Sequence, residues 1–362
     1  MRQTAWTRFV ERATPLVLTM ALAAVAISVA SLGPKSLDQI VTVAAINLVL
    51  VLGTYLFVGN SGVLSFGQMA FAAIGAYTAG LLHIPPEDKA NFLPDLPSWL
   101  GDAHFSALPA ILMGGVVAAA VAAILSVPLM RLSGLSAGLA SLSLLFIGQV
   151  VARAWVDVTR GGKSLAPIPT SIGTTEALIW ALITIAVVFV YQLTPFGLRL
   201  RSSREDDVAA QSIGVAVGRE RGIAFVLSAL FCGFGGALYG LFLGTVNPDL
   251  FFISITFLTV TMLVIGGITS VAGAVVGTIV VSVIAEILRR VQTGDFFGIS
   301  FPSRLGTQTL VLAIVLFLII LLRPDGLTKG KEIPTPRFLR RRAAAGSEPT
   351  VPLPERVDPP AD

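Results

Sequence analysis

The chain has 362 residues, of which 54% are hydrophobic and 13% are charged, and its formal net charge is +4. Soluble domains carry about 25% charged residues. This composition therefore excludes a single globular domain in water and indicates that much of the chain lies in a lipid bilayer. The single cysteine, Cys232, excludes an intrachain disulfide framework, and its apolar neighbours predict a buried side chain.

Apolar stretches recur along the chain at lengths that suit membrane crossing, which takes about 20 residues. They lie at about 14–33, 38–58, 63–82, 107–129, 134–152, 177–194, 223–244, 252–268, 271–288 and 306–322. We therefore predict an all-α polytopic membrane protein with about ten transmembrane helices. The stretch 63–82 and the close pair 252–268 and 271–288 fit least well, and either region is also compatible with a half-helix packed inside the protein.

Basic residues predict the orientation of these spans. With ten spans and a cytoplasmic N-terminus, the cytoplasmic segments hold 17 of the 25 lysines and arginines. They are 1–13, Arg131, 195–222 and the region after the last span. The loop 83–106 then lies outside and carries one lysine against four acidic residues. This excess of inside positive charge predicts that both termini are cytoplasmic.

Three regions follow from this topology. Residues 1–13 form a cytoplasmic N-terminal segment, 14–328 the transmembrane domain with its cytoplasmic loop 195–222, and 329–362 a disordered cytoplasmic tail rich in Pro, Arg and Ala. An alternative for the first 30 residues is a cleaved signal peptide, because Ser28-Val29-Ala30 resembles a small-x-small cleavage site. Cleavage would remove one span and break the even count.

The spans carry almost no charge, since Asp38, Glu176 and Glu286 lie near predicted span ends. A proton- or sodium-coupled transporter usually keeps ionisable residues at membrane depth, so the energy source is expected on other subunits. The segment 161–164 resembles the end of a phosphate-binding loop, but Asp157 stands where that loop needs glycine. We therefore expect no nucleotide, cofactor or metal site in this chain, and no bond chemistry.

A short polar island interrupts the apolar sequence between two predicted spans. It reads Arg204-Glu205-Asp206-Asp207-Val208-Ala209-Ala210-Gln211-Ser212-Ile213-Gly214. As a helix, it places Ala209, Ala210 and Ile213 on one face, which could sit in a groove of a partner protein. Gly214 would permit a tight exit. The other interpretation is an ordinary charged cytoplasmic loop.

The island resembles the EAA-type coupling loop of bacterial ABC importer permeases, in the form found in branched-chain amino acid permeases. Residues Arg204, Ala209, Ala210 and Gly214 match the family pattern, Glu205 and Asp207 keep its acidic character, and Asp206, Gln211 and Ser212 depart from it.

Two further stretches carry the resemblance. Upstream, residues 59–71 read GNSGVLSFGQMAF and are followed by Gly75-Ala76-Tyr77; downstream, residues 235–239 read GGALY and residues 266–273 read GGITSVAG. The resemblance covers about 38–328. The loop 195–222 and the glycine-rich segment 59–77 favour the LivM-type membrane subunit.

The resemblance implies partners and site residues. It implies a second permease subunit, two cytoplasmic ATP-binding subunits and an external substrate-binding protein, in a bacterial inner membrane and in contact with membrane lipid but not with nucleic acid. The expected ATPase-coupling residues are Arg204, Glu205, Asp206, Asp207, Ala209, Ala210 and Gly214. The expected translocation-path residues are Gly62, Ser65, Gly67, Gln68 and Tyr77. The alternative is that the second set only packs helices.

The function expected from this resemblance is ATP-driven import of branched-chain or related amino acids. Family members that move urea, short amides or aromatic acids are an alternative that the spans do not exclude. A passive channel would explain the missing ionisable relay but not the island. An intramembrane enzyme would need a His, Glu or Ser constellation at membrane depth, which the spans lack.

Overall fold

The structure is a computed structural model that describes residue 20, residues 35–132, 134–292, residue 314 and residues 326–328. Within these residues the regular structure is helical, apart from one isolated bridge between Leu165 and Val246. The helices are α2 (Lys35–Ser61), α3 (Gln68–His83), α4 (Pro86–Phe92), α5 (Ser98–Gly101), α6 (Ala107–Leu129), α7 (Gly134–Ala154), α8 (Val156–Thr159), α9 (Thr174–Leu193), α10 (Pro195–Glu205), α11 (Asp207–Ser212), α12 (Val217–Leu243), α13 (Ile253–Gly266) and α14 (Val271–Gln292).

Six of the described helices are long and apolar enough to cross a membrane, namely α2, α6, α7, α9, α12 and α14. They confirm an all-α polytopic fold and six of the ten predicted spans. The predicted spans 14–33 and 306–322, the N-terminal segment 1–13 and the tail 329–362 lie outside the described residues. The count of ten and the cytoplasmic location of both termini stay predictions.

The remaining two predicted spans are shorter helices. Helix α13 has 14 residues and α3 has 16. The predicted start of α3 at residue 63 was wrong, because the helix begins at Gln68 after a non-helical stretch. Gly62 has a φ of +72°, a left-handed conformation that ends α2 and that glycine adopts without strain.

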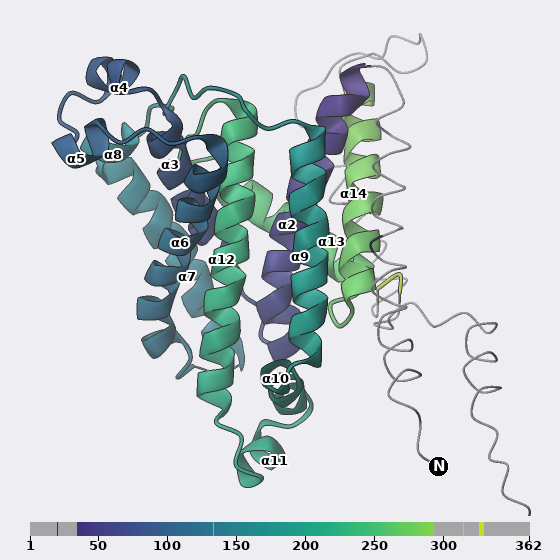
Figure 1. The fold of residues 1–362 in the computed structure, drawn as a ribbon. Coiled ribbons are helices and arrows are strands. Elements are labelled where there is room, and N and C mark those ends of the chain that lie inside the picture. Colours follow the sequence, from purple (N-terminus) through teal and green to yellow (C-terminus); the bar gives the residue numbers. More distant parts are fainter. Residues whose placement is uncertain (1–19, 21–34, 133, 293–313, 315–325, 329–362) are drawn as a thin grey trace, which may run out of the picture.

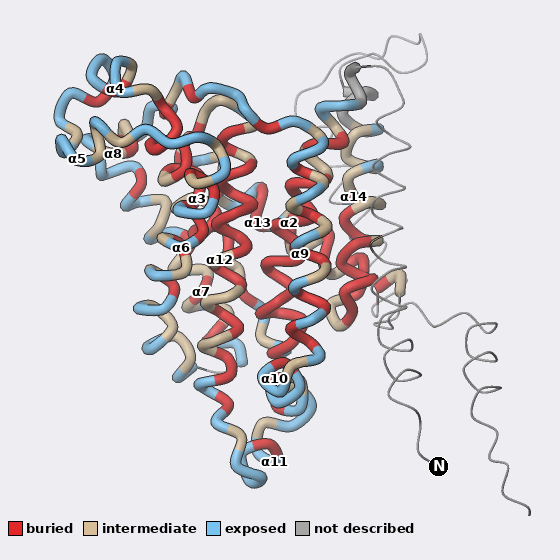
Figure 2. Tube along the Cα trace, in the orientation of Figure 1, coloured by how far each residue is buried: buried red, intermediate tan, exposed pale blue. Residues whose placement is uncertain are grey.

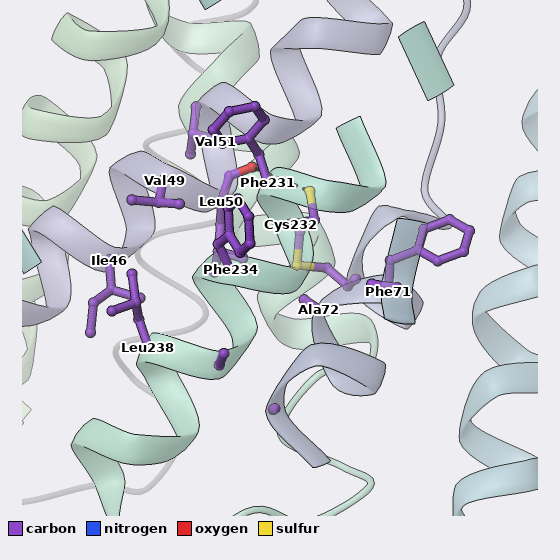
Figure 3. Close-up of a cluster of buried hydrophobic side chains, with 14 of the residues drawn as sticks. Ile46, Val49, Leu50, Val51, Phe71, Ala72, Phe231, Cys232, Phe234 and Leu238 are labelled. Atoms are coloured by element: carbon purple, nitrogen blue, oxygen red, sulfur yellow. Dashed lines mark hydrogen bonds between the residues drawn. The ribbon is translucent and has the colours of Figure 1, made fainter. Parts of the chain in front are cut away.

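Helix α12 lies at the centre of the bundle and packs against α2, α3 and α6. Large apolar side chains from α2, α3 and α12 fill the space between them (Figure 3), and Cys232 is fully buried there. Glycine brings the backbones of α3 and α12 together, because a Cβ added at Gly236 would collide with the carbonyl of Ala72. Residue size thus sets the spacing of these two helices.

The bundle has two distinct ends. Helices α10 and α11 project from one end, whereas α4, α5 and α8 lie at the other (Figure 1). The segments 195–222 and 83–106 therefore lie at opposite ends, as two sides of one membrane require. The outer helices carry many exposed residues (Figure 2). Many of these are large and apolar, and Leu135 of α7 is 81% exposed. Such a surface suits lipid or another membrane subunit rather than water.

Candidate functional site: the α10–α11 loop

Local sequence signals build the two short helices of this loop. Pro195 occupies the first turn of α10, and the Thr194 hydroxyl accepts a hydrogen bond from the Gly197 amide at 3.2 Å. Helix α10 ends at Asp206, which has extended backbone angles and caps α11. One carboxylate oxygen of Asp206 accepts from the amides of Val208 and Ala209 at 2.9 and 3.0 Å. Asp206 therefore starts α11 from within its own loop.

An ion pair joins α11 to the bundle. Asp207 accepts two hydrogen bonds from one guanidinium nitrogen of Arg221, at 2.9 and 2.8 Å. Arg221 lies in the first turns of α12 and is 8% exposed. A charge-assisted contact to so buried a guanidinium is stronger than an exposed surface pair. The ion pair therefore transmits a displacement of α11 to the start of α12.

A second contact joins the end of α10 to α2. Arg204 donates from Nη1 to the Gly59 carbonyl oxygen at 2.9 Å, and from Nε and Nη2 to a Glu205 carboxylate oxygen at 3.1 and 2.7 Å. The Arg204 hydrogen bond holds the pKa of the exposed Glu205 carboxyl below its usual value. The guanidinium thus bridges the loop and the last turn of α2.

The exposed face of α11 differs from the predicted face. Ala210 is 3% exposed and packs within the chain, so the prediction that it shares a free face with Ala209 and Ile213 was wrong. Val208 and Ile213 are instead 74% and 78% exposed. The reason is that Asp207 must face Arg221, which fixes the rotation of α11 and turns Ala210 inward.

Gly214 ends the loop with a φ of +87°. A Cβ at this position would meet no atom within 4 Å, so the glycine is needed for its backbone conformation and not for space. This left-handed residue turns the chain from α11 back toward α12. The loop therefore presents two exposed apolar side chains, Val208 and Ile213, which we call its apolar tip. Hydrogen bonds of Arg204, Asp206 and Asp207 hold this tip in place.

The five predicted path residues do not converge on one cavity. Gly62 lies beneath the loop, where an added Cβ would be 2.6 Å from Arg204 Cγ, and Gly67 lies against α7. Ser65, in the non-helical stretch, and Gln68, the first residue of α3, are buried. Their side-chain polar atoms have no hydrogen-bond partner within the described residues. Tyr77 lines a different, apolar cavity of about 610 Å³.

Orphaned polar atoms distinguish this segment from ordinary helix packing. Buried side-chain polar atoms in native structures are mostly hydrogen-bonded, so each exception asks for an explanation. Ser65 Oγ and both amide atoms of Gln68 are such exceptions. Residues 63–67 are also not helical. Non-helical backbone with polar side chains at membrane depth is tolerated where it is buried in protein or lines a cavity.

Sequence reasoning missed two residues, Val208 in the loop and Arg221 in the adjoining start of α12. Arg221 lies fourteen positions after Asp207, and only the return of α12 to the loop reveals the pair. Val208 is a large apolar residue directly after the charged run Arg204–Asp207, and that contrast in the sequence could have marked it. Among the residues that the structure describes, no group of three His, Cys, Asp or Glu side chains could hold a metal ion.

Comparison with known proteins decides the class of protein. The sequence profile of the family described as "Branched-chain amino acid transport system / permease component" matches residues 36–322. The chain belongs to this family. It is therefore a multi-pass membrane permease of the ABC importer class, and its family is one of transport subunits rather than of catalytic subunits.

Relatives match different shares of the chain. The chain is 27% identical to the high-affinity branched-chain amino acid permease protein LivM of Salmonella typhimurium, over 85% of this chain and 73% of LivM. LivH of Salmonella typhimurium is 28% identical over 45% of this chain and 50% of LivH. The guanosine permease protein NupQ of Bacillus subtilis is 28% identical over 51% of this chain and 60% of NupQ. No solved structure matches the chain.

Proposed function

We propose that the chain is the LivM-like permease subunit of an ATP-driven importer for branched-chain or related amino acids in a bacterial inner membrane. The observation that carries this proposal is α11, a capped helix with an apolar tip at one end of a membrane bundle. Two charged contacts, from Arg204 to Gly59 and from Asp207 to Arg221, tie it to α2 and α12. A helix that transmits the motion of a docked partner to the bundle needs such an exposed surface and such contacts with the membrane helices.

The proposed function requires several partner proteins. One of two cytoplasmic ATPase subunits binds the tip formed by Val208 and Ile213. A second permease completes the translocation path, and an external binding protein delivers the substrate. The similarity to both LivM and LivH supports a permease pair. ATP binding closes the ATPase pair and shifts the two loops, which favours one of two arrangements of the path. Nucleotide thereby changes the relative free energies of the two states.

The experiment is uptake by proteoliposomes that carry the assembled transporter, with ATP inside and the binding protein and labelled L-leucine outside. We expect uptake that needs ATP, binding protein and both permeases. Uptake of L-leucine without ATPase subunits would instead identify a passive channel. Uptake of guanosine but not L-leucine would assign the chain to the substrate class that the name of NupQ gives.

A further inference from the structure

A groove of about 650 Å³ lies between the end of α6 and the start of α12. Helix α12 begins shortly after α11, so the groove lies at the end of the bundle from which α10 and α11 project (Figure 1). The volume is in the range of small-molecule sites. Among the described residues that line the groove, none belongs to the α10–α11 loop. Its occupant is therefore a separate question from ATPase docking.

Divergence of α6 and α12 opens this groove. Midway along α12 the two helices are in contact, because a Cβ added at Gly233 would be 2.7 Å from Ala118 Cβ. About three turns nearer the start of α12, a Cβ added at Gly222 would come no nearer than 3.9 Å to Met130 Cγ and Ser126 Oγ. The space between the helices thus widens toward the start of α12, and Gly222 leaves the floor of the groove without a side chain.

One face of α12 forms an apolar wall of the groove. Ile223, Val226 and Leu227 share this face, and each of them is only half-buried. Val127 of α6, which is 61% exposed, lines the groove from the other helix. Arg221, which holds α11 through an ion pair, is buried on another face of α12. The apolar wall therefore stays open while α12 makes its contact with α11.

Two arginines line the end of the groove that lies nearest the loop. Arg131 follows the last turn of α6, and Arg219 lies in the first turn of α12. Both are exposed, and neither guanidinium forms a hydrogen bond or an ion pair within the described residues. No Asp or Glu is among the described residues that line the groove. Its positive charge therefore calls for an anion, and guanidinium groups bind phosphate oxygens in a bidentate manner.

The order of charge and apolar surface along the groove selects the occupant. Arg219 and Leu227 are eight residues apart, which is about 12 Å along the helix axis. Charge thus lies at one end, and apolar surface extends from it toward the middle of the bundle. A phospholipid has the same order, with a phosphate followed by acyl chains, and basic pockets between membrane helices on the cytoplasmic side bind anionic lipid head groups.

Other occupants match the groove less well. A free phosphate would leave the apolar wall of α12 uncovered. Another membrane subunit over this face would bury two unpaired guanidinium groups, which costs free energy unless that subunit brings acidic partners. A lipid satisfies the arginines and the wall together.

We propose that this groove binds one anionic phospholipid. Its phosphate binds Arg131 and Arg219, and one acyl chain lies along the apolar wall of α12. The bound lipid contacts the end of α6 and the start of α12 together, and so holds in place the helix whose Arg221 is paired with α11. This site goes beyond the proposed import function and does not depend on which substrate is carried.

Photolabelling by lipids tests the site in the assembled transporter. Phosphatidylcholine vesicles carry either a trace of phosphatidylglycerol with a diazirine on one acyl chain or a trace of phosphatidylcholine with the same diazirine. We expect several-fold more labelling of residues 223–227 by the phosphatidylglycerol probe, with no change when inorganic phosphate is added. Equal labelling by both probes would mean ordinary lipid contact and would overturn the proposal.

Two further outcomes would also overturn it. Loss of the labelling on addition of inorganic phosphate would assign the arginines to a soluble anion. Labelling of α7 but not of the groove by either probe would show that another subunit covers this face.

Variants separate the charges from the groove. Arg131→Ala combined with Arg219→Ala should lower the phosphatidylglycerol labelling to the phosphatidylcholine level. Arg201→Ala combined with Lys163→Ala removes the same charge outside the groove and should label like the wild type. Gly222→Leu keeps both arginines but fills the floor, and it should remove the enrichment as well.

Enrichment that survives the double arginine variant would contradict phosphate binding, and enrichment that survives Gly222→Leu would contradict an acyl chain in the groove. Neither readout uses L-leucine uptake. A failure of the lipid site would therefore leave the proposed function standing, and a failure of L-leucine uptake would leave the lipid site standing.

Discussion

Arg204 donates a hydrogen bond from Nη1 to the carbonyl oxygen of Gly59 at 2.9 Å. Gly59 lies in the last turn of α2, where carbonyl groups lack helical partners and carry partial negative charge. The stem of Arg204 rests on Gly62, where an added Cβ would be 2.6 Å from Cγ. The guanidinium therefore links the loop that we assign to the ATPase with the point where α2 gives way to the non-helical segment.

Removal of this link should separate docking from transport. We expect Arg204→Ala to abolish most ATP-driven uptake while the ATPase still co-purifies, because the apolar tip remains. Arg201→Ala is the matched control, since Arg201 lies on the same helix and its side chain forms no hydrogen bond or ion pair within the described residues. Wild-type uptake by Arg204→Ala would show that the Gly59 contact transmits nothing.

The cap of α11 should determine whether the helix forms. Asp206→Ala removes the acceptor for the Val208 and Ala209 amides and should destabilise α11 by about 1 kcal/mol. Asp206→Asn keeps an acceptor oxygen and should retain the helix. Amide hydrogen exchange in α11 measures this directly: faster exchange is expected in Asp206→Ala only. Equal exchange in both variants and the wild type would mean that the Asp206 cap does not hold the helix.

The left-handed turn at Gly214 should respond to backbone preference rather than to size. Gly214→Ala should weaken ATPase association, since a non-glycine residue at φ +87° is strained by about 1–3 kcal/mol. Gly214→Asn should weaken it less, because asparagine enters this region more readily than alanine. Co-purification yields of the ATPase, compared at equal permease amounts, report the order. Stronger binding by the alanine variant than by the asparagine variant would contradict a φ-based explanation.

Contact between α3 and α12 should tolerate no side chain at Gly236. Gly236→Ala places a Cβ on the Ala72 carbonyl, and overpacking of this kind destabilises by about 1–3 kcal/mol. We expect a lower apparent Tm in detergent. Gly101→Ala is the control, because a Cβ there meets nothing within 4 Å, and its Tm should match the wild type. An unchanged Tm for Gly236→Ala would mean that the two helices move apart at no cost.

Hydropathy predicted the spanning helices because burial in lipid is a property of composition. The stretch predicted at 107–129 coincides with α6 at both ends. The break before α3 was placed less well, because a positive φ at Gly62 does not change hydropathy. The sequence showed glycines there, but not which of them ends α2. Local composition therefore located the helices, and backbone conformation set their bounds.

The loop was predicted in its position but not in its geometry, and its coupling role stays a prediction. The charged residues of the island did lie in one loop, yet Asp206 and Asp207 build the loop and Ala210 lies inside it. Their orientation depends on Arg221, which α12 brings back from a distance in sequence. Such contacts between distant segments are not encoded in any local pattern.

The most direct measurement is photo-cross-linking from the tip of α11 within the assembled transporter. A benzophenone maleimide attached to Val208→Cys or Ile213→Cys, in the Cys232→Ala background, should give an adduct of the permease with an ATPase subunit, at a yield that changes when ATP is added. Asn91→Cys, exposed at the opposite end of the bundle, should give no ATPase adduct. If neither tip position forms the adduct and both Val208→Asp and Ile213→Asp transport at wild-type rates, α11 does not dock an ATPase.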